Sequence, residues 1–172
     1  MLHLLPNPRH LELRDGAFSL TLDMCIVLDA NSGMLARTGA RQLQEEVYSA
    51  CGLHVDIRMG KARAGDIRLG VDAAEPAQGY ALTISDAGVA VIGHDEAGLL
   101  HGVQTLRQSI RQCGWTLPAL SIKDAPDYPV RGFYHDQTRG RIGTMDWLKR
   151  LADECCLYKL NQLQLYVEHT YL

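Results

Sequence analysis

The sequence of 172 residues lacks the features that mark several large classes of protein. It has no apolar run of the roughly 18–20 residues that a helix needs to span a bilayer. Its 17 basic and 20 acidic residues give a formal net charge of −3, so it also lacks the basic excess typical of nucleic-acid-binding proteins. We therefore expect no membrane and no nucleic-acid partner. A length of 172 residues suffices for one good core, or for one core and the start of a second, and the hydrophobic content of 47% is ordinary.

Signals for export, disulfides and metal ions are also missing. The first 15 residues have neither the basic region nor the long apolar region of a signal peptide, so we expect a cytoplasmic protein. The five cysteines are an odd number without Cys-x-x-Cys spacing, which favours reduced, mostly buried thiols over a metal or disulfide role. No His-x-His or His-x-x-x-His pair supports a metal site, and nothing points to a cofactor.

Short strands dominate the pattern in residues 1–124. Residues 2–28 are predicted to form strands, with a turn at Asp15-Gly16 and an apolar run at Cys25–Leu28 that is typical of a central strand. Tyr80–Ile84 and Val89–Ile92 flank a short turn and predict a hairpin. Further strands are predicted at residues 53–59, 66–71 and 120–122.

Two amphipathic helices interrupt these strands. The first is predicted from Asn31 to Cys51 and ends at Gly52, a residue suited to a left-handed C-cap. The second begins at His94 or Asp95, and its apolar stripe consists of Leu99, Val103, Leu106 and Ile110. Glycines at positions 98 and 102 indicate close packing of its backbone on the sheet. The predicted fold class is α+β: a mixed, mostly antiparallel sheet with two helices packed on it.

The last third of the chain predicts a strand, a helix and a second strand. Val130–Tyr134 is an apolar run suited to a buried strand, Thr144 is a plausible helix N-cap, and Leu163–Val167 is the second strand. Polar residues follow each strand, where parallel α/β folds gather their chemistry. These polar residues are His135, Asp136, Gln137, Thr138 and Arg139 after the first strand, and Glu168 and His169 after the second.

Several short motifs follow one another along the chain: Gly79-Tyr80, Val91-Ile92-Gly93, Ala97-Gly98, residues 102–106, Leu117-Pro118 to Ile122, Asp124-Pro126-Tyr128, Arg131-Gly132, the Asp-x-x-Arg of Asp136 and Arg139, and Lys159-Leu160-Asn161. In this order the motifs resemble those of one family of enzymes, glycoside hydrolase family 20, the β-N-acetylhexosaminidases. The resemblance implies that residues 1–124 are the non-catalytic N-terminal α+β domain. Residues 125–172 would then be a linker and the first strand, helix and strand of an incomplete (β/α)8 barrel.

The resemblance also implies a reaction, the removal of terminal β-linked N-acetylhexosamine by a retaining, substrate-assisted mechanism. In the family, an Asp-Glu pair after the fourth barrel strand carries this chemistry, and these 172 residues hold no counterpart of it. The pairs Asp95-Glu96 and Asp153-Glu154 are better explained as helix residues. We therefore expect no catalytic residue here and no activity of this chain by itself.

Substrate contacts are the remaining candidates at the strand ends. The resemblance gives Arg139 the role of donating to sugar hydroxyls, with Asp136 beside it to receive a hydroxyl or to hold Arg139. His169 stands where the family has an aspartate. Gln164, Tyr166 and Glu168-His169 together replace the histidines and the Thr-Asp pair that the family commonly has on this strand, which suggests a divergent branch of the family. His135, Glu168 and Tyr166 are weaker candidates.

Two other interpretations of the chain stay open. The first 122 residues also fit glycosidases of family 84 or family 67, although the spacing of Asp136 and Arg139 argues against both. The chain could instead be a stand-alone association module, because two barrel strands leave unpaired edges and an uncovered helix face. In either case we expect a homo-oligomer that forms through residues 130–172, with a carbohydrate as substrate of the parent enzyme.

Overall fold

The computed structural model describes residues 2–30, 32–74 and 76–168. The chain divides into two compact units, Met1–Asp127 and Tyr128–Leu172, which are described separately below. The first unit contains β1 (His10–Ser19), β2 (Cys25–Leu28), α1 (Met34–Cys51), β3 (Asp56–Met59), β4 (Ile67–Val71), β5 (Tyr80–Ser85), β6 (Gly88–Gly93), α2 (Glu96–Cys113) and β7 (Thr116–Asp124). The second contains β8 (Gly132–Asp136), α3 (Met145–Leu157) and β9 (Gln162–Tyr166).

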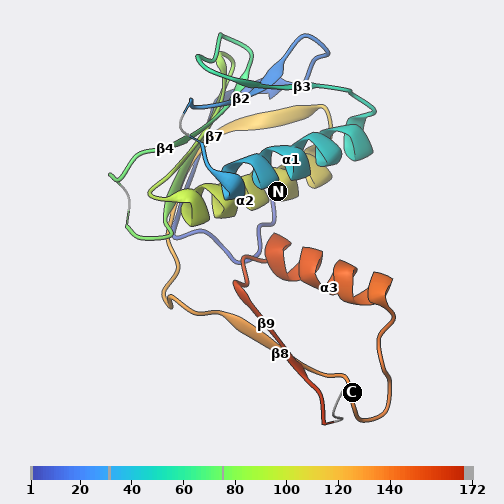
Figure 1. The fold of residues 1–172 in the computed structure, drawn as a ribbon. Coiled ribbons are helices and arrows are strands. Elements are labelled where there is room, and N and C mark those ends of the chain that lie inside the picture. The colour runs from blue at the N-terminus through green and yellow to red at the C-terminus, as the bar shows by residue number, and fades with distance from the viewer. Residues whose placement is uncertain (1, 31, 75, 169–172) are drawn as a thin grey trace. The chain divides into compact units, whose positions relative to one another are not determined.

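The first unit is a mixed sheet of seven strands in the order β1-β7-β5-β6-β4-β2-β3, with α1 and α2 side by side on one face (Figure 1). Strands β1, β7, β5 and β6 pair antiparallel, whereas β6, β4, β2 and β3 pair in parallel. This arrangement confirms the predicted α+β class and its mixed sheet with two helices. It also confirms Cys25–Leu28 as an interior strand, since all four residues are buried between two neighbours.

The two helices bury the stripes that their periodicity predicts. Leu99, Val103, Leu106 and Ile110 of α2 are all fully buried. Asp95 is the N-cap of α2, where its Oδ1 accepts the Gly98 N–H at 2.7 Å. Gly52 closes α1 with a φ of 71°, as predicted, but α1 begins at Met34, later than expected.

Glycines at two positions let α2 lie directly on the sheet. A Cβ on Gly98 would meet the carbonyl oxygen of Gly79 at 2.0 Å, and one on Gly102 would meet Cγ1 of Val91 at 2.5 Å. Both separations are shorter than van der Waals contact, so only glycine fits. The predicted close approach is therefore confirmed.

The predicted turn at Asp15-Gly16 is wrong. β1 runs unbroken through both residues and pairs with β7, and the register shifts between Leu13 and Ala17. Gly16 has a φ of 102° and takes part in this bulge. A bulge and a tight turn use the same residue types, and the long partner strand β7 decides between them.

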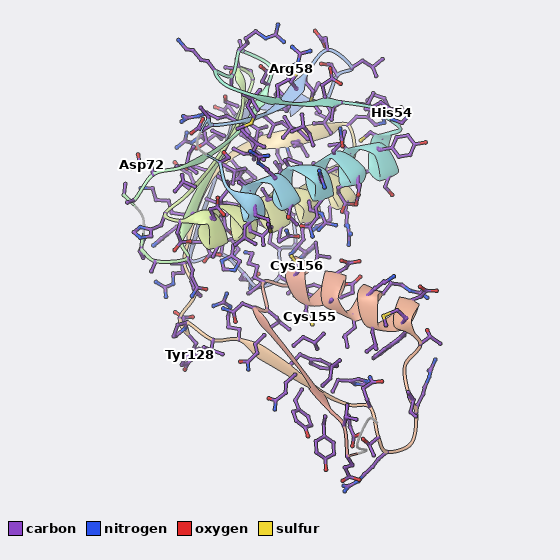
Figure 2. The ribbon with its side chains drawn as sticks, viewed as in Figure 1. His54, Arg58, Asp72, Tyr128, Cys155 and Cys156 are labelled. Carbon is purple, nitrogen blue, oxygen red and sulfur yellow. The ribbon has the colours of Figure 1, made fainter. Side chains whose placement is uncertain are left out.

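The second unit is a strand–helix–strand unit whose two strands pair in parallel, from Gly132 opposite Gln162 to Asp136 opposite Tyr166. Thr144 caps α3 by accepting the Trp147 N–H at 3.2 Å, as predicted. Cys155 and Cys156 are neighbours near the end of α3 and leave it in different directions (Figure 2). Among the described residues, none of the helices combines the length and the apolar composition that a membrane span requires.

Hydrogen bonds between the residues just before β8 and those just before β9 fix where β8 starts. The side-chain amide of Asn161 accepts the Arg131 N–H at 2.8 Å and donates to the carbonyl of Pro129 at 2.8 Å. The Arg131 guanidinium donates to the carbonyl of Lys159 at 2.9 Å.

The expectation that this first strand, β8, is buried is wrong, because Tyr134 is 55% exposed. A sheet of two strands with one helix has too few neighbours to cover both faces.

Candidate functional site

The parallel pairing of β8 and β9 brings two polar strand ends to one edge. Asp136 ends β8 opposite Tyr166, which ends β9. The next residue, Gln137, donates its N–H to the carbonyl of Tyr166 at 2.9 Å and so continues the ladder. Residues 29 positions apart in sequence, Arg139 and Glu168, thereby reach each other. We call Asp136, Arg139, Tyr166 and Glu168 the strand-end cluster.

The Asp136 carboxylate organises the main chain of this edge. Its Oδ1 accepts the N–H of Thr138 at 2.7 Å and that of Arg139 at 3.0 Å. These two hydrogen bonds stabilise the charged form and lower the pKa of Asp136, with help from the nearby Arg139 charge. Asp136 therefore holds Arg139 through its backbone.

The Arg139 guanidinium pairs with a different carboxylate, that of Glu168. The same Glu168 oxygen accepts the hydroxyl of Tyr166, and this hydrogen bond is the main reason that the pKa of Tyr166 is raised. The Glu168 N–H donates to Oγ1 of Thr138 at 2.8 Å, which ties the two strand ends together. Arg139 is thus held at its backbone and at its guanidinium, while 71% of its side chain stays exposed.

His135 lies apart from this cluster. Side chains alternate along a strand, so His135 projects to the face opposite Asp136. Its ring lies 4.7 Å from that of Trp147 on α3, and its Nε2 is buried without a hydrogen-bond partner among the described residues. His169 falls outside the described residues. The structure therefore brings together four of the six predicted residues and separates His135 from them.

Two residues that sequence reasoning placed in the polar run after the first strand, but not among the candidate site residues, also shape the edge. Gln137 is buried, and its Oε1 accepts the Gly143 N–H at 3.0 Å, which anchors the segment before α3. Thr138 is the acceptor for Glu168. Their position directly after a strand was the available signal, but neither carries a charge that would have singled it out.

A second polar site lies in the first unit, where Asp29 and Arg68 form an ion pair beside Lys61. Metal binding has no support at either place. Within residues 2–30, 32–74 and 76–168, no three His, Cys, Asp or Glu side chains are arranged to hold a metal ion.

The sequence and the fold are similar to those of glycosidases. A family model described as "Glycosyl hydrolase family 20, domain 2" matches residues 1–125. The β-N-acetylhexosaminidase of Cellulomonas fimi is 32% identical over 95% of this chain and 34% of its own length. The β-hexosaminidase of Porphyromonas gingivalis is 28% identical over 94% of this chain and 22% of its own length.

A solved structure agrees with these matches. The family 20 β-N-acetylhexosaminidase of Streptomyces coelicolor A3(2) superposes with a TM-score of 0.82 at 28% identity, over 94% of this chain and 34% of that one. The relatives are glycosidases, and the chain spans between a fifth and about a third of the length of those named here. The chain belongs to glycoside hydrolase family 20.

Proposed function

We propose that the strand-end cluster is part of the sugar-binding site of a β-N-acetylhexosaminidase. One observation carries this proposal: Arg139 is fixed at both ends, by Asp136 and by Glu168, yet stays 71% exposed at the carboxyl edge of two parallel strands. A guanidinium held in this way has free, oriented N–H donors for vicinal sugar hydroxyls. By family resemblance the complete enzyme removes terminal β-linked N-acetylhexosamine with retention, assisted by the substrate.

These 172 residues by themselves are expected to bind a sugar weakly and not to hydrolyse it. The family's general acid and its neighbouring aspartate have no counterparts in the sequence. Assay of the chain on a chromogenic N-acetylglucosaminide should give no turnover above background. Sustained turnover would show that other residues carry the chemistry.

Sugar binding can be tested without turnover. Titration of the isotope-labelled chain with N-acetylglucosamine, followed by NMR, should shift the amide signals of Thr138 and Arg139. Arg139→Ala should abolish these shifts, whereas Arg150→Ala, an exposed arginine on α3 of the same unit, should preserve them. Shifts that survive Arg139→Ala, or a wild-type chain that shows none, would contradict the proposal.

A second candidate function is association, which the exposed apolar surface of the second unit favours. Tyr128 is 72% exposed, Val130 62% and Ile142 68%. Among the residues that the structure describes, β8 and β9 pair only with each other, so each strand has an edge that its partner does not cover. We propose that copies of the chain associate through residues 130–172.

A further inference from the structure

The parallel half of the sheet in the first unit contains a topological switch point. β2 lies between β3 and β4 and is parallel to both. The chain leaves β2 through α1, which packs on the core face of the sheet. It leaves β3 through residues 60–66 and enters β4 on the other side of β2.

The segment 60–66 passes over the opposite face. Ala62 and Arg63 line a hollow together with Arg68, Thr83 and Ser85. These last three residues alternate with Ile67, Leu82 and Ile84, which are fully buried in the core, so they face away from the helices. When the connections after two neighbouring parallel strands run over opposite faces of the sheet, a crevice opens at the carboxyl ends of those strands. Such crevices are the usual ligand sites of parallel sheets.

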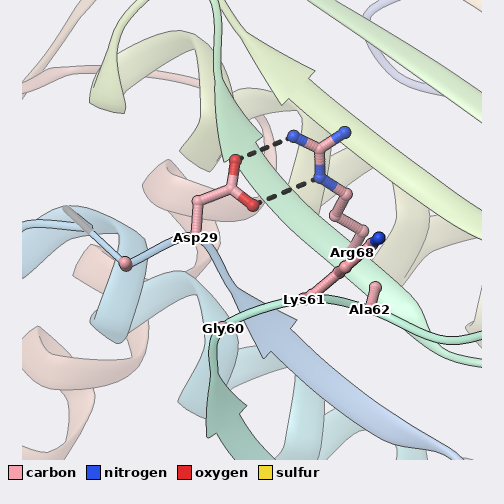
Figure 3. Close-up of a pocket in the computed structure, with 6 residues that line it drawn as sticks. Asp29, Gly60, Lys61, Ala62 and Arg68 are labelled. Atoms are coloured by element: carbon pink, nitrogen blue, oxygen red, sulfur yellow. Dashed lines mark hydrogen bonds and ion pairs between the residues drawn. The ribbon is translucent and has the colours of Figure 1, made fainter.

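A pocket of about 430 Å³ occupies this crevice (Figure 3). Its lining comes from the ends of β2 and β3 and from β4: Asp29, Ala30, Gly60, Lys61, Ala62 and Arg68. Three of the six lining residues, Ala30, Gly60 and Ala62, have small or no side chains, and the volume of the pocket suits one sugar-sized ligand. Main-chain hydrogen bonds hold both strand ends, from the Gly60 N–H to the Leu28 carbonyl at 2.9 Å and from the Asp29 N–H to the Leu69 carbonyl at 3.1 Å.

The polar groups of the pocket are pre-arranged. Arg68 donates to both oxygens of Asp29, from Nε at 3.2 Å and from Nη2 at 2.9 Å. Gly70 makes room for the carboxylate, because a Cβ there would lie 2.3 Å from Oδ2 of Asp29. The pair is partly exposed, 49% at Arg68 and 35% at Asp29, so a ligand can reach its remaining donors and acceptors.

The charges of the pocket define the chemistry of its ligand. Lys61 makes no ion pair or side-chain hydrogen bond with any residue that the structure describes, so its three N–H donors are available. The negative charge of Asp72 also raises the pKa of Arg68. The carboxylates of Asp29 and Asp72 together balance the positive charges of Arg68 and Lys61. A bare anion therefore gains little net attraction. A ligand that brings a carboxylate to Lys61 and hydroxyl donors to Asp29 satisfies both kinds of group.

We propose that this pocket binds a small hydroxylated carboxylate, and specifically an acidic sugar, with Lys61 receiving the carboxylate and the Asp29–Arg68 pair receiving the hydroxyls. The pocket lies within the first unit and shares no residue with the strand-end cluster. Its ligand is independent of the hexosaminidase proposal, and either can fail alone.

The experiment is an NMR titration of the 172-residue chain at constant ionic strength with four probes: glucuronate, methyl β-glucuronide, glucose and acetate. Glucuronate should shift the amides of Asp29–Ala30 and Gly60–Ala62 with saturation, at a dissociation constant of millimolar order. Glucose and acetate should each leave these amides nearly unchanged, because each supplies only half of the required chemistry. Binding of the methyl glycoside would indicate the acidic residue of a glycan, and its rejection a free sugar acid.

Variants of the exposed Lys61 keep the test independent of folding. Lys61→Gln should weaken glucuronate binding about fivefold, and Lys61→Arg should retain it. Lys149→Gln, on exposed α3, is the matched control and should have no effect. Equal shifts with acetate or with glucose, unchanged affinity in Lys61→Gln, or no saturable shift with glucuronate would each overturn the proposal.

Discussion

The Asp136 carboxylate accepts the main-chain N–H of Arg139 at 3.0 Å, and so it holds Arg139 through the backbone and not through the guanidinium. The guanidinium pairs with Glu168. The strand-end cluster thus uses two carboxylates for two tasks. One shapes the backbone after β8, and the other orients the guanidinium from β9's end.

This division predicts how the edge responds to acid. The pKa of Asp136 is lowered from its ordinary value of 3.8 by its two main-chain donors. Because the folded-state pKa is lowered, the hydrogen bonds from Thr138 and Arg139 to the Asp136 carboxylate contribute fully above the unfolded-state pKa. Their contribution is lost as the pH falls through the folded-state pKa. The amide signals of Thr138 and Arg139 should therefore move together below about pH 4. In Asp136→Asn, which does not titrate, this movement should vanish; its persistence would assign the effect to another group.

Glu168 should control the ionisation of Tyr166. The hydroxyl of Tyr166 donates to the Glu168 carboxylate, and deprotonation loses that hydrogen bond and creates a second negative charge. Glu168→Gln removes the charge, so the pKa of Tyr166 should fall toward its ordinary value of 10.0. Ultraviolet titration checks this, with Tyr166→Phe to identify the signal and Glu154→Gln on exposed α3 as the control. An unchanged Tyr166 titration in Glu168→Gln would mean that the two side chains do not interact in solution.

A buried carboxylate between the helices should matter for stability. Glu46 of α1 has a 7% exposed side chain and accepts from Arg107 at 3.2 Å and from Arg111 at 2.8 Å, both on α2. Glu46→Ala leaves Arg107 buried without its carboxylate, although Arg111 can turn to water. We expect the free energy of unfolding to fall by about 2–4 kcal/mol.

Its neighbour provides the control for this prediction. Glu45 is exposed, and Glu45→Ala should change stability by less than about 0.5 kcal/mol. Hydrogen exchange of α1 amides measures both variants in the intact chain. Equal losses of stability for the two substitutions would show that the ion pairs of Glu46 with Arg107 and Arg111 do not stabilise the fold.

Local chemistry accounts for the parts of the fold that the sequence could predict. Asp95 caps α2 and Thr144 caps α3 through hydrogen bonds that span three residues, so the signal and its effect lie in the same turn. The hairpin of β5 and β6 is equally local. In contrast, Asp15-Gly16 forms a bulge because β7, a hundred residues later, pairs on both sides of it.

In the candidate site, too, the local features could be predicted and the long-range contacts could not. That Asp136 and Glu168 lie at the carboxyl ends of neighbouring strands, Asp136 as the last residue of β8 and Glu168 just after β9, could be predicted from the strand–helix–strand pattern. Which carboxylate binds the Arg139 guanidinium could not, because this depends on register between strands and on where β9 ends. β9 ends at Tyr166, so alternation along the strand no longer fixes the direction of Glu168. The burial of β8 was mispredicted because apolar composition leads to burial only where neighbouring elements cover the strand.

The exposed apolar surface of the second unit makes association the remaining prediction. Exposed apolar side chains and uncovered strand edges favour contact with another chain. Sedimentation velocity should show residues 1–172 associating with concentration and a chain cut at Asp124 remaining monomeric. Val130→Lys, at a position 62% exposed, should weaken association, whereas Leu22→Lys, at a position 70% exposed in the first unit, should not. If the long and short chains are both monomers, the surface of residues 130–172 does not bind a second copy. If Leu22→Lys is as disruptive as Val130→Lys, the contact lies in the first unit, and β8 and β9 are not its cause.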